Sequence, residues 1–73
     1  MIHNNYENHY SYDSFNRLSI EDNQRMYKSF SYEYDNNGNL TMVKEGSYDF
    51  KNYKVKQRFA YNNFNQLTKV VYS

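Results

Sequence analysis

The two histidines and their neighbouring carboxylates are the first residues that could support chemistry. His3 and His9 lie near Glu7 and Asp13, and imidazole and carboxylate groups are common metal ligands. Their spacing matches no established metal motif, and the chain has no cysteine to complete a thiolate site. We therefore expect neither a metal nor another cofactor.

Catalytic groups are equally sparse. The acidic pairs Glu21-Asp22 and Glu33/Asp35 could act on a glycosidic bond only across a cleft. No cysteine and no nucleophile elbow are present. The only glycines, Gly38 and Gly46, form no phosphate-binding loop. The sequence therefore predicts a protein that is not an enzyme.

The segment 51–59 interleaves basic and aromatic residues, as proteins that bind single-stranded nucleic acid often do. In a strand, however, Lys54, Lys56 and Arg58 share one face, and Tyr53, Val55 and Phe59 share the other. Stacking and phosphate contacts would then be separated by the sheet. Because the net charge is only +1, we expect a solvated basic stripe and no nucleic-acid partner.

Three gapless copies of one motif, at 10–19, 32–41 and 59–68, account for most of the aromatic residues. We expect a single domain, 1–73, with repeats at about 6–24, 28–45 and 53–72. The second spacing is longer than the first, and the extra residues are predicted to form a loop around Glu45 to Asn52. Internal repeats of this kind indicate that one supersecondary unit recurs.

Each copy reads as strand, tight turn and strand. Aromatic residues recur at every second position, for example Phe30, Tyr32 and Tyr34, which is the period of a strand. No proline interrupts any strand. The predicted fold is therefore all-β: a single twisted antiparallel meander sheet of about six strands, built from three tandem β-hairpins.

The turns share one position that favours a left-handed backbone, occupied by Asn16, Gly38 and Asn65. A type I turn followed by a bulge needs such a residue. The predicted pairs are Tyr12 with Leu18, Tyr34 with Leu40, and Tyr61 with Leu67. A two-residue turn centred on Asn37-Gly38 is the rival, although the other copies offer no equivalent of it.

The residues that open these turns are Asp13, Asp35 and Asn62. Their side-chain oxygens can accept backbone N–H groups within the turn. We expect this structural role for them rather than a catalytic one.

The middle copy, Tyr32-x-Tyr34-Asp35-x-x-Gly38-Asn39-Leu40-Thr41-x-Val43, resembles the YD repeat of Rhs-type proteins. The first copy matches less fully, and the third has Asn62 and Asn65 where the pattern has Asp and Gly. The resemblance implies a spiralling sheet, which in secreted bacterial toxins encloses a C-terminal toxin and which also occurs in animal teneurins. Three repeats are not expected to encircle a cargo, and the 73 residues contain no segment expected to form a toxin domain. The resemblance therefore implies shell material, secreted or at a cell surface if part of a larger protein.

One face of the predicted sheet is much more apolar than the other, and no helical segment is available to cover it. We expect this face to mediate self-association, or to pack against neighbouring repeats of a longer chain. We call it the aromatic face, and its predicted members are Tyr10, Tyr12, Leu18, Ile20, Phe30, Tyr32, Tyr34, Leu40, Met42, Phe59, Tyr61 and Leu67.

A binding module that recognises a glycan or a protein at a cell surface is the alternative, because exposed tyrosine rings suit the apolar face of a sugar. No apolar run is long enough to suggest membrane insertion. The first residues lack the apolar stretch of a signal peptide. We expect any export to depend on a signal elsewhere.

Overall fold

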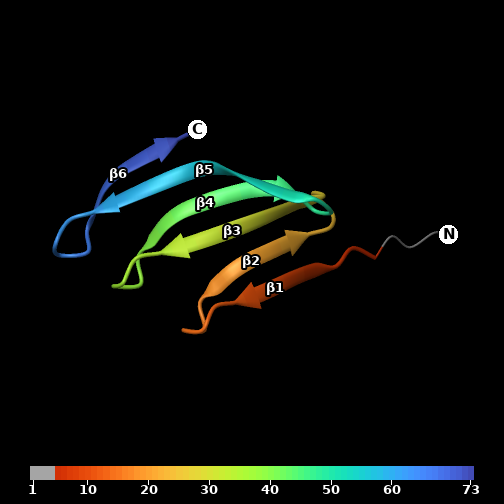
Figure 1. Ribbon diagram of the computed structural model, residues 1–73, viewed down its shortest axis with the longest axis horizontal. Coiled ribbons are helices and arrows are strands. Elements are labelled where there is room, and N and C mark those ends of the chain that lie inside the picture. The colour runs from red at the N-terminus through yellow and green to blue at the C-terminus, as the bar shows by residue number, and fades with distance from the viewer. Residues whose placement is uncertain (1–4) are drawn as a thin grey trace.

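The computed structural model describes residues 5–73, which form one antiparallel sheet with its six strands in chain order (Figure 1). The predicted all-β meander of three tandem hairpins is confirmed. No helix long and apolar enough to cross a membrane occurs in the described range. The strands are β1 (Asn8–Tyr12), β2 (Leu18–Asn23), β3 (Lys28–Tyr34), β4 (Leu40–Ser47), β5 (Lys51–Tyr61) and β6 (Leu67–Tyr72).

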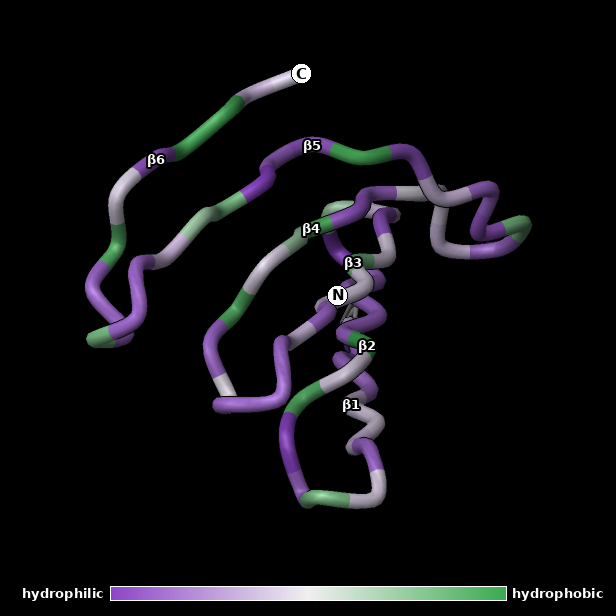
Figure 2. The backbone as a smooth tube through the Cα atoms, turned by 60° about the vertical axis from the view of Figure 1, so that its left-hand side comes forward, coloured by the Kyte–Doolittle hydropathy of each residue, from purple (hydrophilic) through white to green (hydrophobic). Residues whose placement is uncertain are grey.

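The sheet has no conventional core. No hydrophobic side chain in the described range is buried, and the one residue that is completely buried is Ser29, at 0% exposure. Figure 2 shows a single twisted layer in which hydrophilic and hydrophobic positions intermingle along the strands. In a short chain whose commonest apolar residue is tyrosine, the apolar side chains are too few and too polar at their tips to close a dry interior.

All three tight turns lie at one end of the sheet (Figure 1). Asn16, Gly38 and Asn65 have φ angles of 64°, 84° and 62°, so each turn contains the left-handed residue that a bulged hairpin requires. Each hairpin also has the expected register at its turn: the pairs are Tyr12 with Leu18, Tyr34 with Leu40, and Tyr61 with Leu67.

A second bulge follows each turn and changes which residues share a face. Tyr12 pairs with Leu18, but Ser11 pairs with Ile20, so Ser19 is an extra residue between them. The equivalent extra residues are Thr41 and Thr68. Each hydroxyl donates to a carbonyl across the hairpin, for example Ser19 Oγ to Ser11 O at 3.2 Å. An extra residue on one strand interrupts the simple alternation of side chains.

Two residues expected on the aromatic face therefore lie on the other face. Ile20 pairs with Ser11 and Ser31. Met42 pairs with Glu33 and Arg58. Since directly paired residues share a face, the prediction was wrong for Ile20 and Met42. The prediction had assumed that side chains alternate strictly after Leu18 and Leu40, and it did not include the bulge.

The predicted loop around Glu45 to Asn52 is also wrong in extent, because only Tyr48 to Phe50 lie between β4 and β5. The extra residues lengthen both strands, and bulges interrupt their pairing. Gly46 allows the two lengthened strands to lie close together next to their short connection. A Cβ at that position would overlap the backbone carbonyl of Lys51, so the start of β5 can approach β4 closely only over glycine.

Lys54, Lys56 and Arg58 on β5 are all exposed, as the expected solvated stripe requires, but a shift in register divides them between the two faces of the sheet. Lys54 pairs with Glu45 on the aromatic face, whereas Arg58 pairs with Met42 on the opposite face. The shift in register between Val55 and Gln57 separates these two pairs. For the same reason Tyr53 and Val55 lie on the face opposite to Phe59, although exposed and half-buried residues still alternate along the strand.

Candidate self-association surface

The aromatic face is defined from the observed registers. It retains ten of the twelve predicted residues and gains Val43, which pairs with Tyr32, and Val70, which pairs with Phe59. The retained residues are Tyr10, Tyr12, Leu18, Phe30, Tyr32, Tyr34, Leu40, Phe59, Tyr61 and Leu67.

Neighbouring hairpins are joined by the same hydrogen bond twice. Tyr34 Oη donates to Leu18 O at 2.7 Å, and Tyr61 Oη donates to Leu40 O, also at 2.7 Å. In each case the second aromatic residue of one repeat reaches the leucine of the preceding repeat. We call this contact the tyrosine tie. Since it recurs with the same atoms, it is a property of the repeat.

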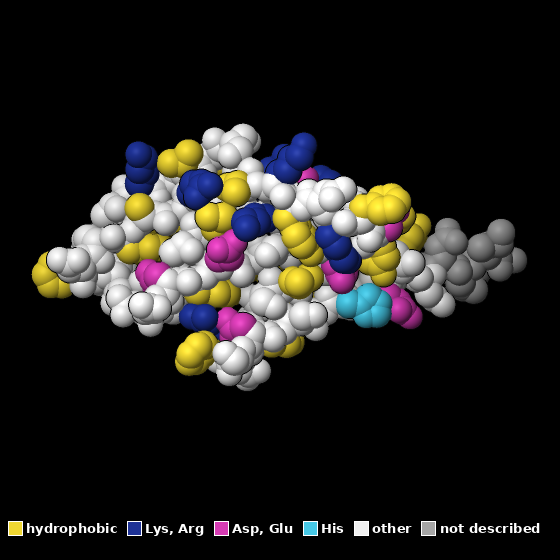
Figure 3. All heavy atoms as spheres, in the orientation of Figure 1, with side chains coloured by type: hydrophobic (Ala, Val, Ile, Leu, Met, Phe, Trp, Pro, Cys, Tyr) yellow, Lys and Arg dark blue, Asp and Glu magenta, His cyan; other side chains and the backbone are white. Residues whose placement is uncertain are grey.

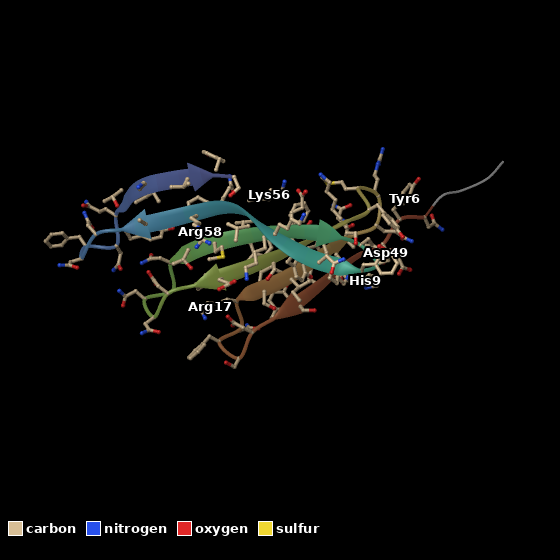
Figure 4. The ribbon with its side chains drawn as sticks, turned by 45° about the horizontal axis from the view of Figure 1, so that its top comes forward. Tyr6, His9, Arg17, Asp49, Lys56 and Arg58 are labelled. Carbon is tan, nitrogen blue, oxygen red and sulfur yellow. The ribbon has the colours of Figure 1, made fainter. Side chains whose placement is uncertain are left out.

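The hairpin turns also touch one another. The Arg17 guanidinium lies 4.6 Å from the ring centroid of Tyr34 in the next repeat, within the range of a cation–π contact. Asn39, the equivalent of Arg17 in the second repeat, donates from Nδ2 to Asn65 Oδ1 of the third at 2.9 Å. Figure 4 labels Arg17 beside the first tight turn. The tight turns of successive repeats therefore contact one another at one end of the sheet.

Asp13, Asp35 and Asn62 each cap their own turn, as expected. Asp13 Oδ1 accepts the backbone N–H groups of Phe15 and Arg17 at 2.9 and 3.0 Å. Asp35 and Asn62 do the same in their own turns. These backbone hydrogen bonds, together with Arg17 at Asp13 and Asn39 at Asp35, lower the pKa of both carboxyl groups.

The lowered pKa values predict a specific loss of stability in acid. A carboxyl whose pKa is depressed by folding stabilises the fold above its unfolded pKa of about 3.9 and loses that contribution as the pH falls through its folded pKa. We expect the variant Asp13→Asn/Asp35→Asn to keep its turns, because Asn62 already supports one. The variant should lose less stability than the wild type between pH 5 and pH 3 in urea titrations.

The reverse change provides the matched control. Asn62→Asp should make the unfolding free energy more sensitive to acid, because the new carboxylate would accept the same two N–H groups. Equal acid dependence in wild type and both variants would show that these caps do not contribute. Hydrogen bonds from Lys51 and Ser29 also lower the pKa of Asp22. Because Asp22 is present in all three proteins, its contribution to the acid dependence is common to them.

A polar cluster on the opposite face joins three strands that are not all neighbours. Ser29 Oγ donates to Asp22 Oδ1 at 2.6 Å and lies 2.7 Å from Tyr53 Oη. Lys51 Nζ donates to the same Asp22 oxygen at 2.8 Å and to Tyr48 O at 2.7 Å. Because Ser29 is completely buried, its hydroxyl is closed to a dissolved substrate. The cluster instead fixes β5 over β2 and β3.

Tyr32 anchors the centre of the aromatic face. Its hydroxyl donates to Glu21 Oε1 at 3.2 Å. Burial, reinforced by the negative charge of Glu21, raises the pKa of Tyr32 to about 12. The phenol therefore stays neutral and donates its hydrogen bond throughout the physiological pH range.

Charged side chains surround the apolar ones. Glu45 on β4 lies 3.5 Å from Lys28 Nζ and 4.0 Å from Lys56 Nζ, and Lys44 Nζ lies 2.7 Å from Glu33. Figure 3 shows hydrophobic groups interspersed with both signs of charge. Such exposed pairs are each worth about 0–1 kcal/mol. They therefore add little to stability.

The residues considered for a metal site have other contacts. His9 Nε2 lies 3.2 Å from Glu7 Oε2, while Asp13 is engaged in its turn and with Arg17 Nε at 2.8 Å. His3 lies outside the described residues. Within residues 5–73 no three His, Asp or Glu side chains gather as a metal site would require.

Comparison with known protein families, with curated proteins and with solved structures finds no match for this chain. The function is therefore argued from the geometry of the repeats.

Sequence reasoning missed the contacts that join the repeats, among them two side-chain hydrogen bonds. The tyrosine tie and the Asn39–Asn65 bond link positions in different copies, whereas the alignment compares copies without placing them side by side. The sequence nevertheless contained an indication of the tyrosine tie, because the tie uses the tyrosine and the leucine that every copy shares. Their recurrence implied a function beyond pairing within one hairpin.

Proposed function

We propose that this protein is a structural repeat module that acts by self-association or as part of a larger array of the same hairpins. The tyrosine tie supports this proposal most directly, because a contact that recurs between successive repeats can continue beyond them. The resemblance of the middle copy to the YD repeat of Rhs-type shells agrees with the same role.

The uncovered aromatic face supplies the driving force. With no hydrophobic residue buried among those described, this sheet of three hairpins keeps apolar surface in contact with water. Monomeric proteins rarely expose large contiguous apolar patches. Covering part of the face would gain roughly 25 cal/mol for each Å² of apolar area removed from water. Association is therefore a source of stability that the isolated chain lacks.

Thermal unfolding over a hundredfold range of protein concentration tests this proposal. Association that favours the folded state raises the melting temperature as concentration increases. We therefore expect circular dichroism melts to shift upward with concentration. A cooperative transition at the same temperature throughout would overturn the proposal. Specific binding on a glycan array by such a concentration-independent monomer would establish the binding module instead.

A further inference from the structure

The two ends of the sheet carry unmatched halves of the tyrosine tie. Tyr12 is the first-repeat equivalent of Tyr34 and Tyr61, yet it is 59% exposed whereas they are half-buried. No residue from 5 to 73 accepts a hydrogen bond from its hydroxyl. At the other end Leu67 is 53% exposed, whereas the leucines that receive a tie are half-buried.

We infer that a second copy of this chain adds its β1 to β6 of the first, head to tail, so that Tyr12 Oη of one copy donates to Leu67 O of the other. This inference rests on the proposed self-association and specifies its surface. The donor and the acceptor are the groups that the internal repeats already use, at 2.7 Å in both observed ties.

The internal repeats also fix the register of the new strand pair. Ile20 pairs with Ser31 between the first two repeats, and the equivalent residues Met42 and Arg58 pair between the last two. Applying the same relation once more places Lys69 of one copy opposite His9 of the next. A one-residue slip would turn the aromatic face over and lose the tie.

The tight turns supply a second donor and acceptor pair for the contact between copies. Asn39 Nδ2 donates to Asn65 Oδ1 between the second and third repeats. Gln66 occupies the position of Asn39 in the third repeat, and Asn16 occupies that of Asn65 in the first. In the head-to-tail pair the Gln66 amide therefore reaches Asn16 Oδ1 of the next copy.

Both edges are open to such an addition. Within the described chain β1 pairs only with β2, and β6 only with β5. Figure 1 shows these strands at opposite edges of the sheet, so one chain cannot satisfy both. Unpaired edge strands are templates for β-addition. Because the two surfaces differ, the contact is heterologous and can continue from copy to copy.

Disulfide trapping tests the register directly, since the chain has no native cysteine. The variant His9→Cys/Lys69→Cys should form a ladder of disulfide-linked multimers under mild oxidation, because paired residues on antiparallel strands lie about 4.5–5.5 Å apart. Within one chain the two positions are five strand spacings apart, roughly 24 Å along the sheet. Any ladder on a non-reducing gel therefore reports contacts between copies.

The matched control, Ser11→Cys/Lys69→Cys, displaces one cysteine by two residues while keeping it on the same face. It should give much less ladder than His9→Cys/Lys69→Cys. Equal cross-linking of both variants, or no ladder in a protein that still associates, would overturn the head-to-tail register and leave the proposed function standing. A protein that is monomeric at every concentration would overturn both.

A second measurement isolates the tie itself. Tyr12→Phe should weaken the association constant about fivefold, the effect of losing one hydrogen bond of ordinary strength. Unchanged association of Tyr12→Phe would contradict the assignment of Leu67 O as the acceptor.

Discussion

Gly46→Ala is expected to lower the free energy of unfolding by about 3 kcal/mol, the upper end of the usual cost of overpacking. The added Cβ would overlap the carbonyl carbon and oxygen of Lys51. Since these are backbone atoms, no side-chain rotation can make room for it. The start of β5 would move away from β4, and Lys51 would lose its position beside Asp22. Urea titration followed by circular dichroism measures the change.

Gly38 provides the control for this prediction. Its φ is 84°, but a Cβ there would meet nothing within 4 Å, and asparagine occupies the equivalent position in the other two turns. Gly38→Asn should therefore change the free energy of unfolding by less than about 1 kcal/mol. If Gly46→Ala were as mild as Gly38→Asn, the close approach of β4 and β5 would be wrong.

The double variant Tyr34→Phe/Tyr61→Phe is expected to lose about 2 kcal/mol of stability, roughly 1 kcal/mol for each tie. The phenylalanine rings keep the apolar contacts, so the loss isolates the hydroxyl groups that bond to Leu18 O and Leu40 O. Both carbonyl groups would have to find water in a part-buried position. Chemical denaturation of the variant and the wild type, each at low concentration, measures the difference.

Tyr12→Phe is the matched control, because the same substitution in the first repeat removes a hydroxyl that has no partner among residues 5–73. At concentrations where the chain is monomeric, it should change stability by less than about 0.5 kcal/mol. Equal losses at positions 12, 34 and 61 would mean that the ties between repeats contribute nothing specific.

The hairpins were predictable from sequence because each depends on local chemistry repeated three times. Tyr34 pairs with Leu40, and Asp35 caps its turn, since the left-handed position at Gly38 sets the register a few residues away. Alternating aromatic residues then defined the strands, and short connections implied a meander.

The errors began where an extra residue entered a strand. Ser19 and Thr41 shift the register, which moves Ile20 and Met42 to the other face. A bulge depends on how two strands twist together, and the alternation of one strand does not reveal it. The hydroxyl residue that follows leucine in every copy was a usable signal, because it recurs as Ser19, Thr41 and Thr68 and bonds across each hairpin.

The position of β5 over β2 and β3 could not be predicted from the local sequence, for a different reason. It depends on Gly46 meeting Lys51 and on the long-range contacts of Ser29 with Asp22 and Tyr53. In the sequence Ser29 resembles any other strand residue, and only the structure shows that side chains from β2 and β5 contact it. Polar groups that are buried together must satisfy one another, but the sequence alone does not show which of them meet.

Sedimentation equilibrium of the full chain tests the central claim most directly, because it measures mass without requiring a label or a variant. The structural-module account predicts an average mass that rises above the 9.0 kDa of one chain as concentration increases. A mass of 9.0 kDa at every concentration up to the millimolar range would contradict the account.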